Sequence, residues 1–440
     1  MQLFENQIKM IFVPKILFFL SFVWGQITIL QSGKLIDGVS KNPKNVFSIL
    51  IENNKIIDVV EGYVDPGEGD QAIDLNNYTV LPGLMDMHVH LSGESNPKKY
   101  LERFNMNLDD YAYRSISYAE KTLLAGFTTV RDLGGPVNTS LKKSINKGWV
   151  VGPRIFSAGK ALATTGGHAD PTNGMSFELA GDPGPKQGVV NGVADSRKAV
   201  RQQYKNGADL IKITATGGVL SVAKNGENPQ FSEDEIFEIV KTASDYNMHV
   251  AAHAHGAEGM KRAIRAGVKS IEHGTLMDDE TIGLMKKFGT FYVPTISAGE
   301  FVAEKAKIDG YYPDVVQPKA AKIGPQLKNT FKKAYNAGVK IAFGTDAGVS
   351  YHGENAKEFR YMIDAGMSPM EAIFSATKTA SILLGEEKNL GSIEKGKLAD
   401  IIAVKGDPLE NIDCLENVVF VMKNGVIYKN LITKHGGSFE

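Results

Sequence analysis

Two histidines separated by a single residue, His88 and His90, follow a Pro-Gly turn and an apolar run in the segment 81–91. Alternate side chains of an extended strand lie on the same face, so both imidazoles are expected to point the same way. Two imidazoles that converge from one strand end are a natural beginning for a metal site. The pair alone is a weak indication, because two polar residues leaving a strand look the same. Whether the pair belongs to a metal site depends on finding matching ligands at the ends of later strands.

Most of the other histidines also follow strand-like segments. Seven of the nine histidines do so, and Asp346 joins them after the strand expected at 340–343. These seven are His88, His90, His168, His253, His255, His273 and His352. If the strands form one parallel barrel, their carboxyl ends share one rim, which is where the active sites of such barrels lie. We therefore predict a single site built from these residues.

Lys212 lies inside the apolar strand expected at 210–213. A buried ammonium group is costly unless its charge is altered or paired. Carbamylation by carbon dioxide would turn the lysine into an anionic oxygen ligand that bridges two divalent metals, and such a centre polarises a carbonyl and lowers the pKa of a bridging water. An unmodified lysine would be repelled by two metals, so a site with one metal is the structural alternative. The simpler structural alternative is an unmodified lysine whose side chain extends its charged end to solvent.

The middle of the chain alternates between strand-like and helix-like segments. Besides the strand that carries His88, strands are expected at 128–131, 154–157, 210–213, 249–252, 270–272, 291–293 and 340–343. Helix-period segments separate them, and Ser232 and Glu235 form a capping box at the start of one. Eight strands that alternate with helices favour an α/β fold, the (β/α)8 TIM barrel, over residues 81–389.

Both ends of the chain have a different, β-like pattern. Short apolar runs lie at 27–30, 47–51 and 56–60, with a hairpin turn expected at 52–55, and again at 400–404, 418–422 and 426–428. We therefore expect one small β-sandwich domain built from residues 26–80 and 390–432.

The candidate ligands resemble those of a known family. The set of His88, His90, Lys212, His253, His273 and Asp346 is similar to the metal site of the amidohydrolase superfamily, over nearly the whole chain after the first 25 residues. The motifs at 81–90, 215–218, 253–256, 271–275 and 344–346 are similar to those of its imidazolonepropionase-related group. That group includes metal-dependent Xaa-Pro dipeptidases (prolidases) and ochratoxin-hydrolysing amidases.

The resemblance implies a role for each of these residues. His88 and His90 would bind one divalent metal, His253 and His273 the other, and Lys212, carbamylated by CO2, would bridge the two. Asp346 would bind metal, act as general base toward a bridging hydroxide, and pass its proton to the leaving amine. Histidine and carboxylate ligands suit zinc, with manganese or cobalt as alternatives.

Three further residues are candidates for contact with the substrate. His168, in the loop 164–170, is predicted to polarise a carbonyl or bind a carboxylate, and otherwise caps its loop. His255 has the same strand parity as His253 and faces either the site or solvent at a helix start. Arg131 ends the second strand and either pairs with a substrate carboxylate or belongs to a structural ion pair. For His352 a plain loop role is favoured.

Composition bounds the partners and the compartment. The 440 residues carry a formal net charge of −1, from 49 Lys and Arg against 50 Asp and Glu, which gives no reason to propose nucleic acid as a partner. Residues 1–25 have the pattern of a signal peptide, so we expect a secreted or periplasmic protein with no stable membrane span after cleavage; the alternatives are an uncleaved membrane tether or a misassigned start of the chain. Cys414 is the only cysteine, which leaves no internal disulfide and is expected to be inert. Related enzymes suggest a homo-oligomer.

These expectations converge on hydrolysis of an amide bond. The first expectation is a dipeptide or N-acyl amino acid with a free carboxylate, and within that class an Xaa-Pro or Xaa-hydrophobic dipeptide. Hydrolysis of a cyclic amide or imide, or deamination, is the alternative, although those sites usually hold one metal and need no bridging lysine. A barrel kept as a non-catalytic scaffold is a remote third reading, opposed by the intact ligand set.

Overall fold

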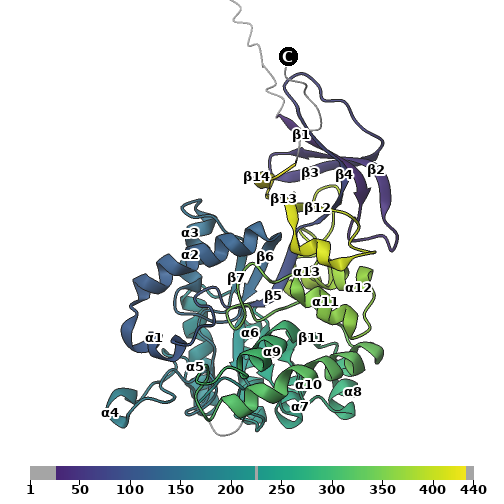
Figure 1. Cartoon of the computed structure of the whole chain (residues 1–440). Coiled ribbons are helices and arrows are strands. Elements are labelled where there is room, and N and C mark those ends of the chain that lie inside the picture. The colour runs from purple at the N-terminus through teal and green to yellow at the C-terminus, as the bar shows by residue number, and fades with distance from the viewer. Residues whose placement is uncertain (1–25, 223–225, 433–440) are drawn as a thin grey trace, which may run out of the picture.

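Both ends of the chain contribute strands to one seven-stranded sheet (Figure 1). The computed structural model describes residues 26–222 and 226–432, and the expected signal peptide at 1–25 lies outside them. The strand order is β14-β13-β12-β4-β1-β2-β3, with β1 parallel to β4 and the other neighbours antiparallel. The strands are β1 (Ile27–Leu35), β2 (Lys44–Glu52), β3 (Lys55–Glu61), β4 (Gln71–Pro82), β12 (Ile401–Lys405), β13 (Val418–Lys423) and β14 (Val426–Asn430).

One buried apolar cluster holds this sheet together. It takes Leu30 and Ile49 from the first strands and Ile401 and Phe420 from the last ones. The predicted hairpin turn at 52–55 is confirmed, because β2 ends at Glu52 and β3 begins at Lys55. The sequence predicted a sandwich of strands from both termini, and the structure joins those strands in a single hydrogen-bonded sheet.

The middle of the chain forms two parallel sheets. One contains β5 (Leu84–Val89), β6 (Phe127–Asp132) and β7 (Arg154–Ser157); the other contains β8 (Ile211–Thr214), β9 (Val250–Ala254), β10 (Ser270–His273) and β11 (Phe291–Val293). Single bridges continue the pairing beyond these strands. Leu162 pairs with Ile213, Tyr292 pairs with Ile341, and the Met87 amide donates to the Phe343 carbonyl at 2.9 Å. The eighth strand expected at 340–343 is therefore present only as a bridged segment between β11 and β5.

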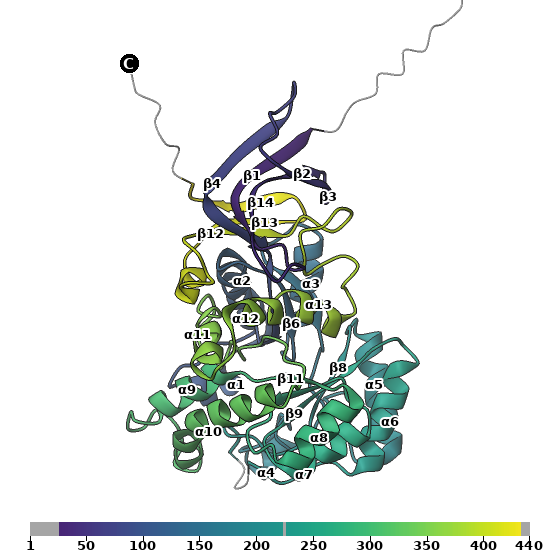
Figure 2. The ribbon, with the colours of Figure 1, turned by 90° about the vertical axis from the view of Figure 1, so that its right-hand side faces the viewer.

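Helices follow most of these strands. Figures 1 and 2 show the seven-stranded sheet at one end of the molecule and helices α5 to α10 around the parallel strands at the other. The capping box of Ser232 and Glu235 is confirmed at the start of α6. The helices are α1 (Lys99–Asn105), α2 (Leu108–Leu124), α3 (Asn138–Asn146), α4 (Phe177–Ala180), α5 (Gly192–Lys205), α6 (Glu233–Ser244), α7 (Ala257–Arg265), α8 (Asp279–Phe288), α9 (Ile296–Lys305), α10 (Gln317–Asn336), α11 (Lys357–Asp364), α12 (Pro369–Ser375) and α13 (Lys378–Leu384), with a 3-10 turn at Ile412–Glu416.

An arginine links the parallel strands to the C-terminal part of the chain. Arg154 of β7 donates to the Asp400 carboxylate at 2.7 Å and to the Thr129 hydroxyl at 2.8 Å, and it also binds the Asn424 side chain.

Within 26–222 and 226–432, no helix has the length and apolar character needed to cross a membrane.

Candidate metal and substrate site

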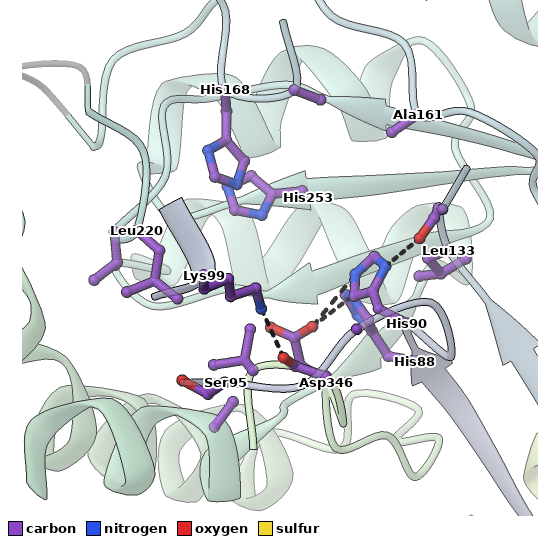
Figure 3. A pocket seen from close by; sticks show the side chains of 18 of the residues that line it. His88, His90, Ser95, Lys99, Leu133, Ala161, His168, Leu220, His253 and Asp346 are labelled. Atoms are coloured by element: carbon purple, nitrogen blue, oxygen red, sulfur yellow. Dashed lines mark hydrogen bonds and ion pairs between the residues drawn. The ribbon is translucent and has the colours of Figure 1, made fainter. Parts of the chain in front are cut away.

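The carboxyl ends of the parallel strands meet in a cavity of about 490 Å³. Figure 3 shows His88, His90 and Asp346 on one side of it and His168 with His253 on the other. The predicted site residues that line this cavity are His88, His90, His168, Lys212, His253, His255, His273 and Asp346. The structure thus brings together the whole predicted ligand set and two of the three predicted substrate-contacting residues.

His88, His90 and Asp346 are positioned as a metal-binding group. The potential ligand atoms of these three residues all lie within 4.8 Å of one another. The Oδ1 atom of Asp346 is 3.4 Å from the Nε2 atoms of both histidines. This oxygen is buried and has no hydrogen-bond partner in the described part of the chain. Two imidazole nitrogens around an unsatisfied carboxylate oxygen form the donor set that a divalent metal such as zinc takes.

Hydrogen bonds at the back of three histidines fix which nitrogen faces the cavity. The Nδ1 atom of His88 is 2.9 Å from Glu272, that of His90 is 2.7 Å from the Gly134 carbonyl, and that of His273 is 2.8 Å from the Thr295 hydroxyl. Such outer contacts orient an imidazole and leave its other nitrogen available for a metal. In all three residues that nitrogen is Nε2.

His253 presents the opposite nitrogen. Its Nε2 atom lies 3.0 Å from the Gly217 carbonyl, so Nδ1 is the available ligand atom. The ring lies 4.7 Å from the His273 ring, so these two histidines form a second group beside the first. His255 uses Nδ1 to contact the Thr275 hydroxyl at 2.7 Å, which leaves Nε2 for a ligand in the cavity. The predicted preference for His253 over His255 as the metal ligand remains a prediction.

Lys212 is buried beside the first group of ligands. Its Nζ atom is 3.5 Å from Nε2 of His88. Burial lowers the pKa of Lys212 to about 8, against the opposing attraction of Glu272 and Asp346. Burial likewise raises the pKa of Asp346 to about 7, against the attraction of Lys212. The uncharged amine, which is the form that reacts with carbon dioxide, is thus more accessible here than in an exposed lysine.

Two ligands lie at backbone positions that side chains rarely adopt. His273 has φ of 69° and Asp346 has φ of 57°, both in the left-handed region. A non-glycine residue pays of order 1–3 kcal/mol to stay there, and such residues cluster at functional sites. At these two strand ends the unusual backbone turns the side chain toward the cavity.

Arg131 does not reach the cavity. It is fully buried below it, where it donates to the Glu272 carboxylate at 2.8 Å, to the Ser270 hydroxyl at 3.1 Å and to the Met87 carbonyl at 2.6 Å. All three contacts are internal to the protein. The substrate-carboxylate role that the sequence suggested for Arg131 is therefore corrected to the structural ion pair that it left open.

His168 lies in its loop and reaches into the cavity. Its ring stacks on that of His253 with centroids 4.4 Å apart. Its Nδ1 atom is buried and has no hydrogen-bond partner among residues 26–222 and 226–432. His352 lies outside the cavity lining, donates from Nε2 to the Gly93 carbonyl at 2.8 Å and stacks on Tyr118, which agrees with a plain loop role.

Two buried acids, which the sequence analysis did not single out, support the candidate site. Asp86 accepts from the His88 amide at 3.0 Å, from the Thr345 hydroxyl at 2.6 Å and from Asn355 at 2.8 Å, and burial raises its pKa to about 6. Glu272 contacts His88 and Arg131. Both acids interrupt short apolar strands one or two residues before a predicted ligand, and that pattern is the signal that could have identified them.

The rest of the cavity wall is largely apolar. Val302 of α9 and Ile323 and Leu327 of α10 face it, together with Leu220 and Val349. Helix α1 adds Lys99 and Tyr100. The cavity therefore combines a polar floor of candidate metal ligands with walls that suit an apolar side chain.

Comparisons with known proteins give the same picture. The profile of the amidohydrolase family matches residues 79–432. Ochratoxinase from Aspergillus niger is 34% identical over 436 residues, which cover 92% of this chain and 87% of the relative. The structure of a Xaa-Pro dipeptidase with methionine in its active site matches with a TM-score of 0.90 and 56% identity, over 92% of this chain and 100% of the other. The structure of a prolidase complexed with N-methylphosphonate-L-proline matches with a TM-score of 0.85 and 34% identity, over 92% and 100%.

Replacement of Arg131 by Met is expected to destabilise the fold. Glu272 would keep a buried negative charge without its cation, and breaking a buried pair in this way costs about 3–5 kcal/mol. Urea unfolding of the metal-free protein measures this free energy. The matched control is Arg265→Met, which removes a much more exposed pair with Glu233 and should cost less than about 1 kcal/mol. Equal stability of both variants would show that the buried pair has no such structural role.

Proposed function

The chain belongs to the amidohydrolase family, whose members hydrolyse amide bonds, and on this premise we propose that it is a binuclear metallohydrolase of dipeptides or N-acyl amino acids with a free carboxylate. Xaa-Pro and Xaa-hydrophobic dipeptides are the first candidates. The observation that carries the proposal is the convergence of all six predicted ligands on one cavity.

We propose His88, His90 and Asp346 as ligands of one divalent ion, and His253 and His273 as ligands of a second. The donor set fits zinc, because imidazole nitrogens and a carboxylate are its usual nitrogen and oxygen ligands. Lys212, as a carbamate, would stand between the two groups and supply the negative charge that two adjacent cations require. When bound, the ions would polarise the amide carbonyl and make water a stronger nucleophile.

The protein's own side chains would then handle orientation and proton transfer. Asp346 would accept the proton of the attacking water and return it to the leaving amine, as a general base and then a general acid. His168 and His255 line the cavity with one ring nitrogen each left for the substrate, which supports them as contacts to the scissile carbonyl or the carboxylate.

The shape of the cavity supports a small substrate with an apolar group. Val302, Ile323 and Leu327 would surround the side chain of the residue that leaves as the amine. The similar dipeptidase holds methionine, and the similar prolidase holds a proline phosphonate. An apolar pocket distinguishes side chains by about 1–3 kcal/mol per methylene, so a graded preference among apolar residues is expected rather than strict selection.

The proposal also includes a closed barrel, a small domain made from both chain ends, and export of the protein. The bridges from Leu162 to Ile213 and from Tyr292 to Ile341 support closure of the two parallel sheets into a (β/α)8 barrel over 81–389. The shared apolar cluster supports a sandwich-like domain from 26–80 and 390–432. We retain cleavage after residue 25, export to the periplasm or medium, and a homo-oligomeric state as proposals.

The function is tested by amine release from Xaa-Pro, Xaa-Leu, Xaa-Phe and N-acetyl amino acids. Protein loaded with zinc in the presence of bicarbonate should cleave a subset of the dipeptides. Lys212→Ala should lower kcat/KM by at least about a thousandfold, because the bridging anion is lost. Lys269→Ala, a lysine at the opposite end of the strands, is the control and should leave kcat/KM unchanged. Zinc-bound protein that is silent across this panel, yet opens cyclic amides or releases ammonia, would replace the dipeptidase proposal.

The proposed role of His168 is tested at the glycine under its ring. A Cβ atom added to Gly218 would lie 2.2 Å from the His168 ring, so Gly218→Ala must displace the imidazole. If His168 touches the substrate, kcat/KM should fall about 10- to 100-fold while zinc content stays unchanged. The control is Gly184→Ala in the same region of the chain, where an added Cβ meets nothing within 4 Å. Full activity of the Gly218 variant would remove His168 from the substrate-binding set.

A further inference from the structure

Helix α1 places a lysine in the cavity that the proposed mechanism has not used. Lys99, at the start of α1, lines the cavity, and Figure 3 shows its ammonium group directed toward Asp346. The Nζ atom donates to the Gly348 carbonyl at 2.7 Å, two residues beyond Asp346. The lysine therefore reaches the loop that carries the proposed general base.

Two arginines also line the cavity, and each of them already has a partner in the protein. Arg114 is neutralised by Glu102 through two bonds of 2.7 and 2.9 Å. Arg103 donates to the Asn173 carbonyl at an exposed position. Among the ion pairs within the described ranges, none includes Lys99.

An ammonium group has three donors, and the contact with Gly348 uses one of them. The charge of Asp346 attracts this ammonium group, but no ion pair joins the two residues, so the remaining donors can bind the carboxylate of a ligand. Lys99 thus has both the charge and the free donors to bind an anion inside the cavity, whereas Arg114 is already paired.

The covalent geometry of a dipeptide says where such an anion would lie. In a dipeptide the free carboxylate carbon is within about 4 Å of the carbonyl carbon under attack, because only the amide nitrogen and one Cα separate them. A side chain that binds this carboxylate must therefore lie next to the catalytic group. Lys99 meets that requirement through its bond to the Asp346 loop, whereas Arg131, the earlier candidate, is sealed below the cavity.

The neighbour of Lys99 fixes the helix that carries it. The Tyr100 hydroxyl donates to the Leu220 carbonyl at 2.8 Å, which ties α1 to the segment that follows β8. Leu220 and Val349, next to Gly348, belong to the same apolar lining. A carboxylate bound at Lys99 would therefore place the adjoining side chain against apolar walls.

We propose that Lys99 binds the free α-carboxylate of the substrate and makes this enzyme select amides whose leaving residue ends in a carboxylate. The inference rests on the proposed function, because it assigns a position to the carboxylate of that substrate class. It also separates two roles: Lys99 binds the substrate, and the ligands on the cavity floor perform the hydrolysis.

The experiment compares each enzyme on a dipeptide that the wild type cleaves and on the same dipeptide with a C-terminal amide. The wild type should prefer the free acid strongly. Lys99→Met should lower kcat/KM for the acid about 10- to 150-fold, chiefly through KM, and change that for the amide less than about threefold, because only the acid loses a charge-assisted hydrogen bond. Lys99→Arg should recover part of the loss. Lys98→Met, one residue away and exposed, is the matched control and should behave as the wild type.

A second readout does not depend on turnover. Titration of the zinc-loaded protein with L-methionine and with L-methioninamide should show that the wild type binds the acid more tightly and that Lys99→Met loses this difference. An equal loss of acid and amide hydrolysis would mean that Lys99 only anchors α1 to Gly348, and would overturn the inference while the dipeptidase proposal stands. A wild type that cleaves no dipeptide and no N-acetyl amino acid of the panel overturns the proposed function, and the inference falls with it.

Discussion

A buried carboxylate, Glu272, connects the fold of this protein to its chemistry. One oxygen accepts from Arg131 at 2.8 Å, and the other contacts Nδ1 of His88 at 2.9 Å. Through these bonds β10 is tied to β6 and β5, and Arg131 adds a bond to the Met87 carbonyl next to His88. Charges buried this deeply are tolerated only when every hydrogen-bonding position is satisfied, so the group allows little movement. The orientation of His88, and with it the geometry of the candidate metal-binding group, depends on this interior ion pair.

A second buried carboxylate, Asp86, also holds candidate site residues in place through several hydrogen bonds. Asp86 holds the His88 backbone and the Thr345 side chain at once, and Thr345 precedes Asp346. The carboxylate therefore fixes the distance between His88, a proposed ligand on β5, and Asp346, the proposed general base, which lies 258 residues later in the chain. The left-handed backbone at Asp346 and His273 is stable only because such contacts surround it. The rigid hydrogen-bonded contacts lie below the candidate ligands, and the apolar walls from α9 and α10 lie above them.

The sequence was sufficient for the parts of the site that depend on strand period and chain order. His88 and His90 share a face because they are two residues apart, and Lys212, His253, His273 and Asp346 each follow or lie in a short apolar strand. It was insufficient where a side chain's direction depends on packing. Arg131 lies near the end of a strand, which is where a substrate-binding residue is expected. Its side chain instead forms an ion pair with the buried Glu272 in the interior. Lys99 belongs to a short helix whose position is set by Tyr100 and Leu220, and local pattern carries no information about that contact. The eighth strand was predicted as a full strand, but in the structure it is a short bridged segment, in which Ile341 pairs with Tyr292 and the Phe343 carbonyl accepts from the Met87 amide.

We propose that one cavity holds two metal ions bridged by carbamylated Lys212. Anomalous diffraction from crystals of the zinc-loaded protein, recorded on both sides of the zinc absorption edge, tests this binuclear centre directly. Two anomalous peaks per chain are expected, one beside His88 and His90 and one beside His253 and His273, with electron density for a carboxylated Lys212 between them. A single peak with an unmodified Lys212 amine would instead indicate a mononuclear enzyme.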